Sequence, residues 1–175
     1  MVVEKLYKFH NFITKEECDY FISQIPLQES YDVDSWDHRI FPISENDWQT
    51  KHLSHIITRV QAFLKEKINV SVDLLRCQLQ IWPIGSESNL HVHYNPITPN
   101  DNFGDWNCSL YLNDDFEGGE FIMEDGPSFK PEPGLLTFYN GVKDYHGLNR
   151  VESGNHRFTV LFWWDNTNFD DVINN

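Results

Sequence analysis

Four residues in the second half of the chain have the types and spacing of a metal-dependent reaction centre. His91 and His93 are one residue apart, and His146 and Arg157 follow downstream. In an extended strand residues i and i+2 project to the same face, so the pair would aim two imidazoles into one space. His146 would complete a facial set of three ligands, which leaves coordination positions open for small molecules. This arrangement is typical of catalysis rather than of a closed structural site.

Arg157 belongs to a strand pattern in which Thr159 shares its face. A guanidinium can bind a carboxylate through two parallel hydrogen bonds, and a neighbouring hydroxyl adds a third contact. We therefore expect Arg157 and Thr159 to hold the far end of a small dicarboxylate. The near end of the same molecule would chelate the metal.

Composition limits the class of protein before any fold is considered. The chain has 175 residues, is 40% apolar and contains 13 Phe, 7 Tyr and 6 Trp, which is ample surface for the core of one domain spanning residues 1–175. The 13 basic and 27 acidic residues give a formal net charge of −14, which argues against nucleic acid and anionic membranes as partners. The pattern of the three cysteines, Cys18, Cys77 and Cys108, and the lack of a signal-like or membrane-spanning segment predict a cytoplasmic protein with reduced thiols.

The order of the predicted elements is helices first and strands second. Thr14 and Glu17 form a capping-box pattern that begins a helix, and Pro26 ends it. A second helix is predicted over residues 47–67, so residues 1–69 form a helical support region. From residue 70 the apolar period changes to two, with further strands predicted near residues 90–95, 107–112, 119–123, 134–139, 145–151 and 156–164. The prediction is a mainly β protein with a jelly-roll core over residues 70–165, also called a double-stranded β-helix, supported by N-terminal helices.

The region from Leu75 to Trp164 resembles the 2-oxoglutarate and Fe(II)-dependent dioxygenases, in particular their prolyl 4-hydroxylase-like branch. The resemblance rests on an ordered series of motifs: Leu110–Tyr111–Leu112–Asn113–Asp114, Gly118–Gly119–Glu120, Lys130–Pro131–Glu132–Pro133–Gly134, His146 and Arg157. It implies an Fe(II) ion held by His91, His93 and His146. It also implies that 2-oxoglutarate binds Arg157 and Thr159, with Tyr111 as a further contact. The implied reaction is hydroxylation of a peptidyl, prolyl-type, or amino-acid substrate with molecular oxygen.

One position departs from the pattern of this family. The family carries an aspartate where this chain has His93, while the following Tyr94–Asn95–Pro96 still resembles the family's continuation. Three neutral imidazoles would leave the metal with its full double charge, which affects redox tuning and metal preference. Another register would pair His93 with Asn95, and Asp101 or Asp105 of the following loop could supply a carboxylate.

Two other classes of function stay open. Gly85, His91 and His93 match the opening of the cupin motif, whose members share a jelly roll and often use three histidines without 2-oxoglutarate. The chain could also be a non-catalytic metal-binding module of the same fold. For an enzyme, we expect the substrate to contact residues 31–47 and 96–105, and the acidic exterior favours a basic or neutral peptide.

Overall fold

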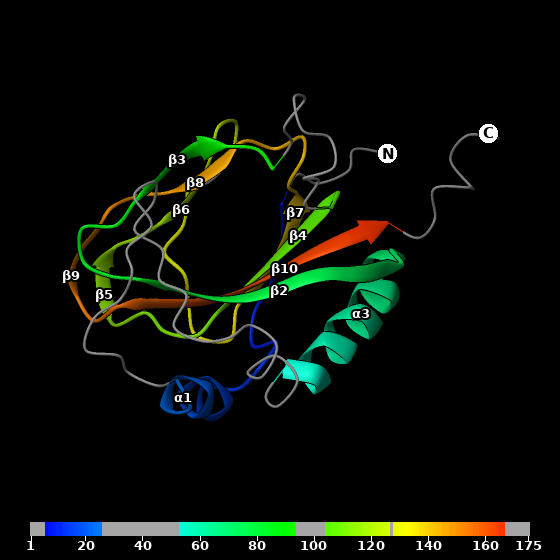
Figure 1. Cartoon of the computed structure of the whole chain (residues 1–175), viewed down its shortest axis with the longest axis horizontal. Coiled ribbons are helices and arrows are strands. Elements are labelled where there is room, and N and C mark those ends of the chain that lie inside the picture. The colour runs from blue at the N-terminus through cyan, green and yellow to red at the C-terminus, as the bar shows by residue number, and fades with distance from the viewer. Residues whose placement is uncertain (1–5, 26–52, 94–103, 127, 167–175) are drawn as a thin grey trace.

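The computed structural model describes residues 6–25, 53–93, 104–126 and 128–166 (Figure 1). Its strands form three antiparallel sheets, with the orders β1-β7-β4-β10-β2, β3-β8-β6 and β5-β9. The elements are β1 (Leu6–Phe9), α1 (Lys15–Ser23), α3 (Ser54–Ile68), β2 (Val72–Trp82), β3 (Ser88–His91), β4 (Trp106–Tyr111), β5 (Phe116–Gly118), β6 (Phe121–Met123), β7 (Leu136–Asn140), β8 (His146–Leu148), β9 (Val151–Gly154) and β10 (Arg157–Asn166). The five-stranded and three-stranded sheets face each other, and α1 and α3 lie against the outer face of the larger sheet (Figure 1).

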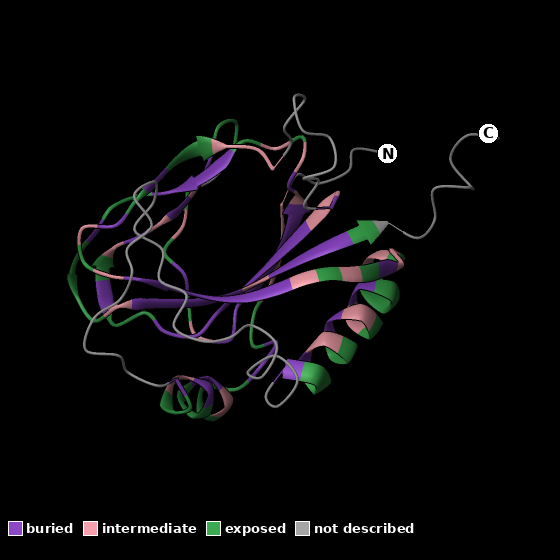
Figure 2. Cartoon of the chain, viewed as in Figure 1, coloured by how far each residue is buried: buried purple, intermediate pink, exposed green. Residues whose placement is uncertain are grey.

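This arrangement confirms the predicted jelly roll with flanking helices. The strand β10 lies between β2 and β4 and is rich in β-branched and aromatic residues, which favour a pleated, buried surface. Both of its faces are covered, because one packs on the helices and the other lines the interior of the roll. Figure 2 shows the resulting band of buried residues along β10 and β4, with exposed residues along the outer sides of both helices.

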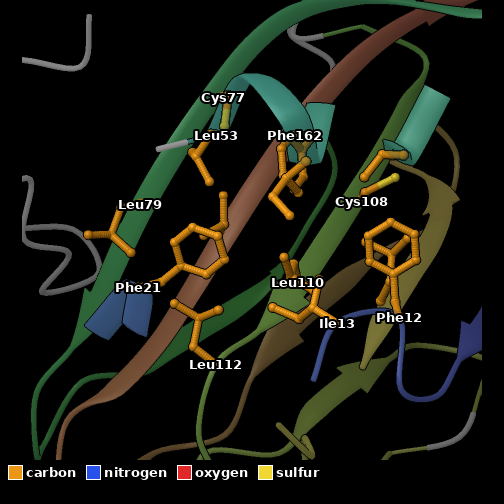
Figure 3. Packing of buried hydrophobic residues seen from close by; sticks show 14 of the residues in the cluster. Phe12, Ile13, Phe21, Leu53, Cys77, Leu79, Cys108, Leu110, Leu112 and Phe162 are labelled. Atoms are coloured by element: carbon orange, nitrogen blue, oxygen red, sulfur yellow. The ribbon is translucent and has the colours of Figure 1, made fainter. Parts of the chain in front are cut away.

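The main core lies between the helices and the five-stranded sheet. Phe21 of α1 packs among side chains of β2, β4 and β10 such as Leu79, Leu110 and Phe162 (Figure 3). A β-bulge in β2, opposite Trp163 and Trp164, changes which side chains of β2 point toward the core. Leu74 packs on the core there, and Leu75 is left 48% exposed.

The helix α1 begins as the sequence predicts. The Glu17 amide donates to the Thr14 hydroxyl at 3.1 Å, and the Thr14 amide donates to the Glu17 carboxylate at 2.8 Å, which completes the capping box. The helix α3 ends at Ile68, and its C-cap residue Asn69 adopts a left-handed conformation with φ 57°. The first residues of the helix predicted over 47–67 lie outside the described residues. Neither described helix has the length and hydropathy needed to cross a membrane.

Three short strands were not predicted from the sequence. The strand β1 lies inside the region expected to be helical and pairs with β7 at the edge of the large sheet. The strands β5 and β9 form the two-stranded sheet. Each has only three or four residues, too few for an alternating pattern to distinguish a strand from a loop.

Candidate metal centre and anion-binding pocket

The structure brings His91, His93 and His146 together. Their candidate ligand atoms all lie within 4.8 Å of one another, and the Nε2 atoms of His91 and His93 are 3.2 Å apart. His91 ends β3 and faces His146 of β8 across the ladder, so strand pairing sets their separation. His93 lies beyond the end of β3, where its backbone amide donates to the Gly141 carbonyl at 2.8 Å.

Of the other carboxylate and amide candidates, Asp105 is described by the structure and does not join this group. Among the described residues, the cluster contains only the three histidines. Burial, followed by the charge of Asp165, raises the pKa of Asp105. Asn95 and Asp101 lie outside the described residues, as do the predicted substrate segments 31–47 and 96–103.

His146 is the most enclosed of the three histidines, with 4% of its surface exposed. Its ring is nearly parallel to that of Phe121, with 6.0 Å between the ring centres, and the centre of the Tyr139 ring lies 4.7 Å away. Burial, followed by the proximity of His93 and His91, holds the pKa of His146 well below its usual range. A neutral imidazole is the form that binds a metal, so this environment favours the ligand state at neutral pH.

Arg157 is a buried cation. It is 4% exposed, its Nη1 donates to the Thr159 hydroxyl at 2.9 Å, and its guanidinium lies 5.1 Å from the centre of the Tyr111 ring. No carboxylate of the described residues pairs with it, and its Nε has no hydrogen-bond partner there. Burial lowers the pKa of Arg157 to about 10, so the group stays charged at neutral pH. A charge buried in this way is stabilised by an anionic ligand.

One pocket joins the histidines to Arg157. It has a volume of about 470 Å³, its open mouth included, and both groups line it. Gln80, Thr159 and Tyr111 lie abreast on β2, β10 and β4 and form part of its wall. Burial raises the pKa of Tyr111, whose hydroxyl lies near Ser109, while neither this hydroxyl nor Nε2 of Gln80 has a hydrogen-bond partner in the described structure. These unsatisfied polar groups suit a polar ligand.

Two residues of this region were not identified from the sequence. Gln80 alternates with apolar residues on β2, a pattern that normally marks a solvent-exposed face, yet it is 1% exposed and lines the pocket. Trp163 is the second of these residues. It is buried, but its indole N–H donates to Nδ1 of His93 at 3.2 Å. Trp82 also lines the pocket, and Trp164 packs in the main core.

The residues present fit a divalent metal and a dicarboxylate. Metal–imidazole bonds of about 2.1 Å place neighbouring ligand atoms about 3 Å apart, close to the separation of Nε2 in His91 and His93. Imidazole is a suitable ligand for iron. Arg157, buried with no anion among the described residues, supplies the charge that a dicarboxylate needs.

A family model described as the 2OG-Fe(II) oxygenase superfamily matches residues 77–165. The chain belongs to this superfamily. The match runs from β2 to β10 and therefore contains all three histidines and Arg157. It confirms the predicted family, whose cofactors are Fe(II) and 2-oxoglutarate, abbreviated 2OG in the family's description.

Known relatives of this oxygenase-family chain include prolyl hydroxylases. It is 39% identical over 69 residues to prolyl 3-hydroxylase 2 of Rattus norvegicus and of Homo sapiens, an alignment that covers 35% of this chain and 10% of each relative. The chain thus spans about a tenth of the length of these curated relatives. Prolyl-4-hydroxylase from Pseudomonas putida has a TM-score of 0.70 at 14% identity, with 93% of this chain and 92% of that one covered.

A second solved structure has a similar likeness. The viral collagen prolyl hydroxylase of Paramecium Bursaria Chlorella virus-1, solved as a 2OG complex, has a TM-score of 0.69 at 17% identity and covers 92% of this chain and 95% of its own. At these identities the structural likeness establishes the shared double-stranded β-helix fold. These solved structures of low sequence identity therefore confirm the predicted fold.

Proposed function

We propose that this oxygenase hydroxylates a peptidyl, prolyl-type, or amino-acid substrate with Fe(II), 2-oxoglutarate and molecular oxygen. The observation that carries the proposal is that three clustered histidines and Arg157, a buried cation with no carboxylate partner among the described residues, line the same pocket. A metal bound at one end and an anion bound at the other match the two functional groups of 2-oxoglutarate. The relatives named prolyl hydroxylases support the choice of substrate.

In this proposal each part of the pocket has a defined task. His91, His93 and His146 hold Fe(II), Arg157 and Thr159 bind the distal carboxylate of 2-oxoglutarate, and Tyr111 contacts the same molecule. The bound metal supplies oxygen activation, in which 2-oxoglutarate and O₂ yield succinate, CO₂ and one oxygen atom inserted into a substrate C–H bond. The buried wall of the pocket fixes the orientation of the co-substrate before the substrate enters.

The net charge of the protein supports a basic peptide as the substrate. With a formal net charge of −14, the protein attracts basic peptides over long range and repels acidic ones. We expect a basic peptide to be turned over faster than an acidic version at low salt, and equal rates would contradict this. A cytoplasmic location also stays a prediction, which the buried free thiols of Cys18, Cys77 and Cys108 support.

The presence of His93 in place of the family's aspartate supports two alternative functions. A three-histidine centre could work without 2-oxoglutarate, as in cupin-type enzymes, or the fold could bind metal without catalysis. Both alternatives leave Arg157 without a reason to be charged, buried and open to the pocket. We therefore place them second to the oxygenase.

The test is succinate formation by protein purified without oxygen and then supplied with Fe(II), 2-oxoglutarate and O₂. Arg157→Ala should abolish succinate formation, and Arg150→Ala, which removes an exposed arginine, should leave it unchanged. Calorimetric titration of 2-oxoglutarate into the anaerobic Fe(II) protein separates binding from turnover when the preferred substrate is missing. Equal binding by wild type and Arg157→Ala would refute the assigned clamp.

A further inference from the structure

The three clustered histidines differ in what faces Nδ1, the ring nitrogen remote from the cluster. Nδ1 of His91 lies 2.8 Å from the carbonyl oxygen of Asn89 and 3.3 Å from the hydroxyl of Ser88, which donates to the same carbonyl. Nδ1 of His146 lies 2.8 Å from the carbonyl oxygen of Asp144. Nδ1 of His93 instead lies 3.2 Å from the indole nitrogen of Trp163. A carbonyl oxygen only accepts a hydrogen bond, whereas an indole N–H only donates one.

These partners determine where each neutral ring carries its proton. A carbonyl partner requires N–H at Nδ1, so His91 and His146 present the lone pair of Nε2 to the cluster, as a metal ligand must. A neutral His93 that accepts from Trp163 at Nδ1 carries its proton on Nε2. That N–H lies 3.2 Å from Nε2 of His91 and can donate to it.

The indole of Trp163 is held in place by its surroundings. Trp163 is 3% exposed, lies opposite Asn107 in the ladder between β10 and β4, and has the guanidinium of Arg76 5.5 Å from its ring centre. The edge of His93 is also closely packed, because a Cβ atom added at Gly141 would lie 3.1 Å from Nδ1. The indole N–H of Trp163 is therefore held toward Nδ1 of His93.

We propose that Trp163 makes His93 a conditional ligand, so that His91 and His146 bind the metal firmly and His93 binds only when its hydrogen bond to Trp163 is broken. This inference rests on the metal site of the proposed function and makes Trp163 a positioning residue. An aspartate at position 93 would meet no such conflict, since one carboxylate oxygen could accept from the indole while the other bound the metal. In this chain the same donor opposes the third ligand.

The decisive measurement is metal affinity, with Co(II) alone as an oxygen-stable probe and calorimetry as the readout. Trp163→Phe removes the donor and keeps an aromatic ring, and we expect it to tighten Co(II) binding roughly tenfold, within the range known for groups that orient metal ligands. His93→Ala should weaken binding less than threefold in the presence of Trp163 and roughly tenfold in the Trp163→Phe background. Unchanged or weaker binding by Trp163→Phe, or an equal cost of His93→Ala in both backgrounds, overturns the inference.

Two controls separate this inference from its premise. Trp164→Phe alters the neighbouring tryptophan on the core side of β10 and should leave Co(II) affinity unchanged. His146→Ala should abolish binding, and if it does not, the metal site itself is refuted together with the proposed function. ¹⁵N NMR of the metal-free wild type reads the tautomers without any substitution. A proton on Nε2 of His93 and on Nδ1 of His91 and His146 is expected, and a proton on Nδ1 of His93 would contradict the argument.

Discussion

Thr159→Val gives the sharpest test of how 2-oxoglutarate is bound. The substitution keeps a β-branched side chain of nearly equal shape in β10 and removes only the hydroxyl that accepts from Arg157 at 2.9 Å. Thr159 is 1% exposed and lines the pocket beside Arg157. With its oxygen engaged by Arg157, the hydroxyl proton is available to the distal carboxylate of the co-substrate.

A hydrogen bond to a charged group contributes about 1.5–3 kcal/mol, which corresponds to a roughly 10- to 150-fold weaker binding of 2-oxoglutarate. Calorimetric titration of 2-oxoglutarate into the anaerobic Fe(II) protein gives this ratio, and the KM for 2-oxoglutarate in a succinate assay gives an independent value. Thr159→Ser, which keeps the hydroxyl, should bind within about threefold of the wild type. Equal affinity of the valine and serine variants would refute the placement of the carboxylate beside Thr159.

Three predictions concern the protein outside the pocket. Burial raises the pKa of Cys18 from 9.0 to about 11. At pH 8 its thiolate fraction is therefore about 100-fold lower than that of a free thiol. Labelling of Cys18 by a disulfide reagent should be at least about 100-fold slower in the folded protein than in the unfolded protein. Because the unfolded thiol ionises first, the contribution of Cys18 to stability is lost as the pH rises from 9 to 11, which denaturant titrations of wild type and Cys18→Ala can compare. Leu110→Ala in the fully buried core should lower the free energy of unfolding by about 2–5 kcal/mol, whereas Leu75→Ala on the exposed part of β2 should change it by less than about 1 kcal/mol. Thr14→Ala should cost about 1 kcal/mol by removing the cap of α1, and Thr14→Ser should restore most of it; equal stability of the two variants would contradict the assigned cap.

Local sequence signals predicted much of the fold. The capping box of Thr14 and Glu17 acts within one turn of helix, so four residues were enough to place the start of α1. The alternation along β10 placed Arg157 and Thr159 on one face, because side-chain direction in a strand depends only on the parity of position. Strand β1 was missed since its pairing with β7 joins residues more than 120 positions apart, which no short window reveals.

The site was only partly predictable for the same reason. The spacing of His91 and His93 correctly indicated a shared space, although β3 ends at His91 and the contact of His93 with Gly141 sets its position. The donor that faces His93 comes from Trp163, 70 positions later, so the orientation of that ring depended on tertiary structure. Gln80 was missed because a buried polar wall and a solvent-exposed face produce the same alternating pattern.

Strand β10 carries two sets of side chains in one continuous stretch. Arg157, Thr159 and Leu161 line the pocket, and Trp163 on the same face contacts His93. Phe158, Val160, Phe162 and Trp164 face the helices and belong to the main core. A shift of register by one residue would therefore turn the core side chains toward the pocket and the pocket side chains toward the helices. Fraying of this strand would therefore disturb the pocket wall and the main core together. The alternate positions of β10 can accordingly be randomised as two separate libraries. The pocket-side library would be screened for altered activity, and the core-side library would be screened for the yield of folded protein.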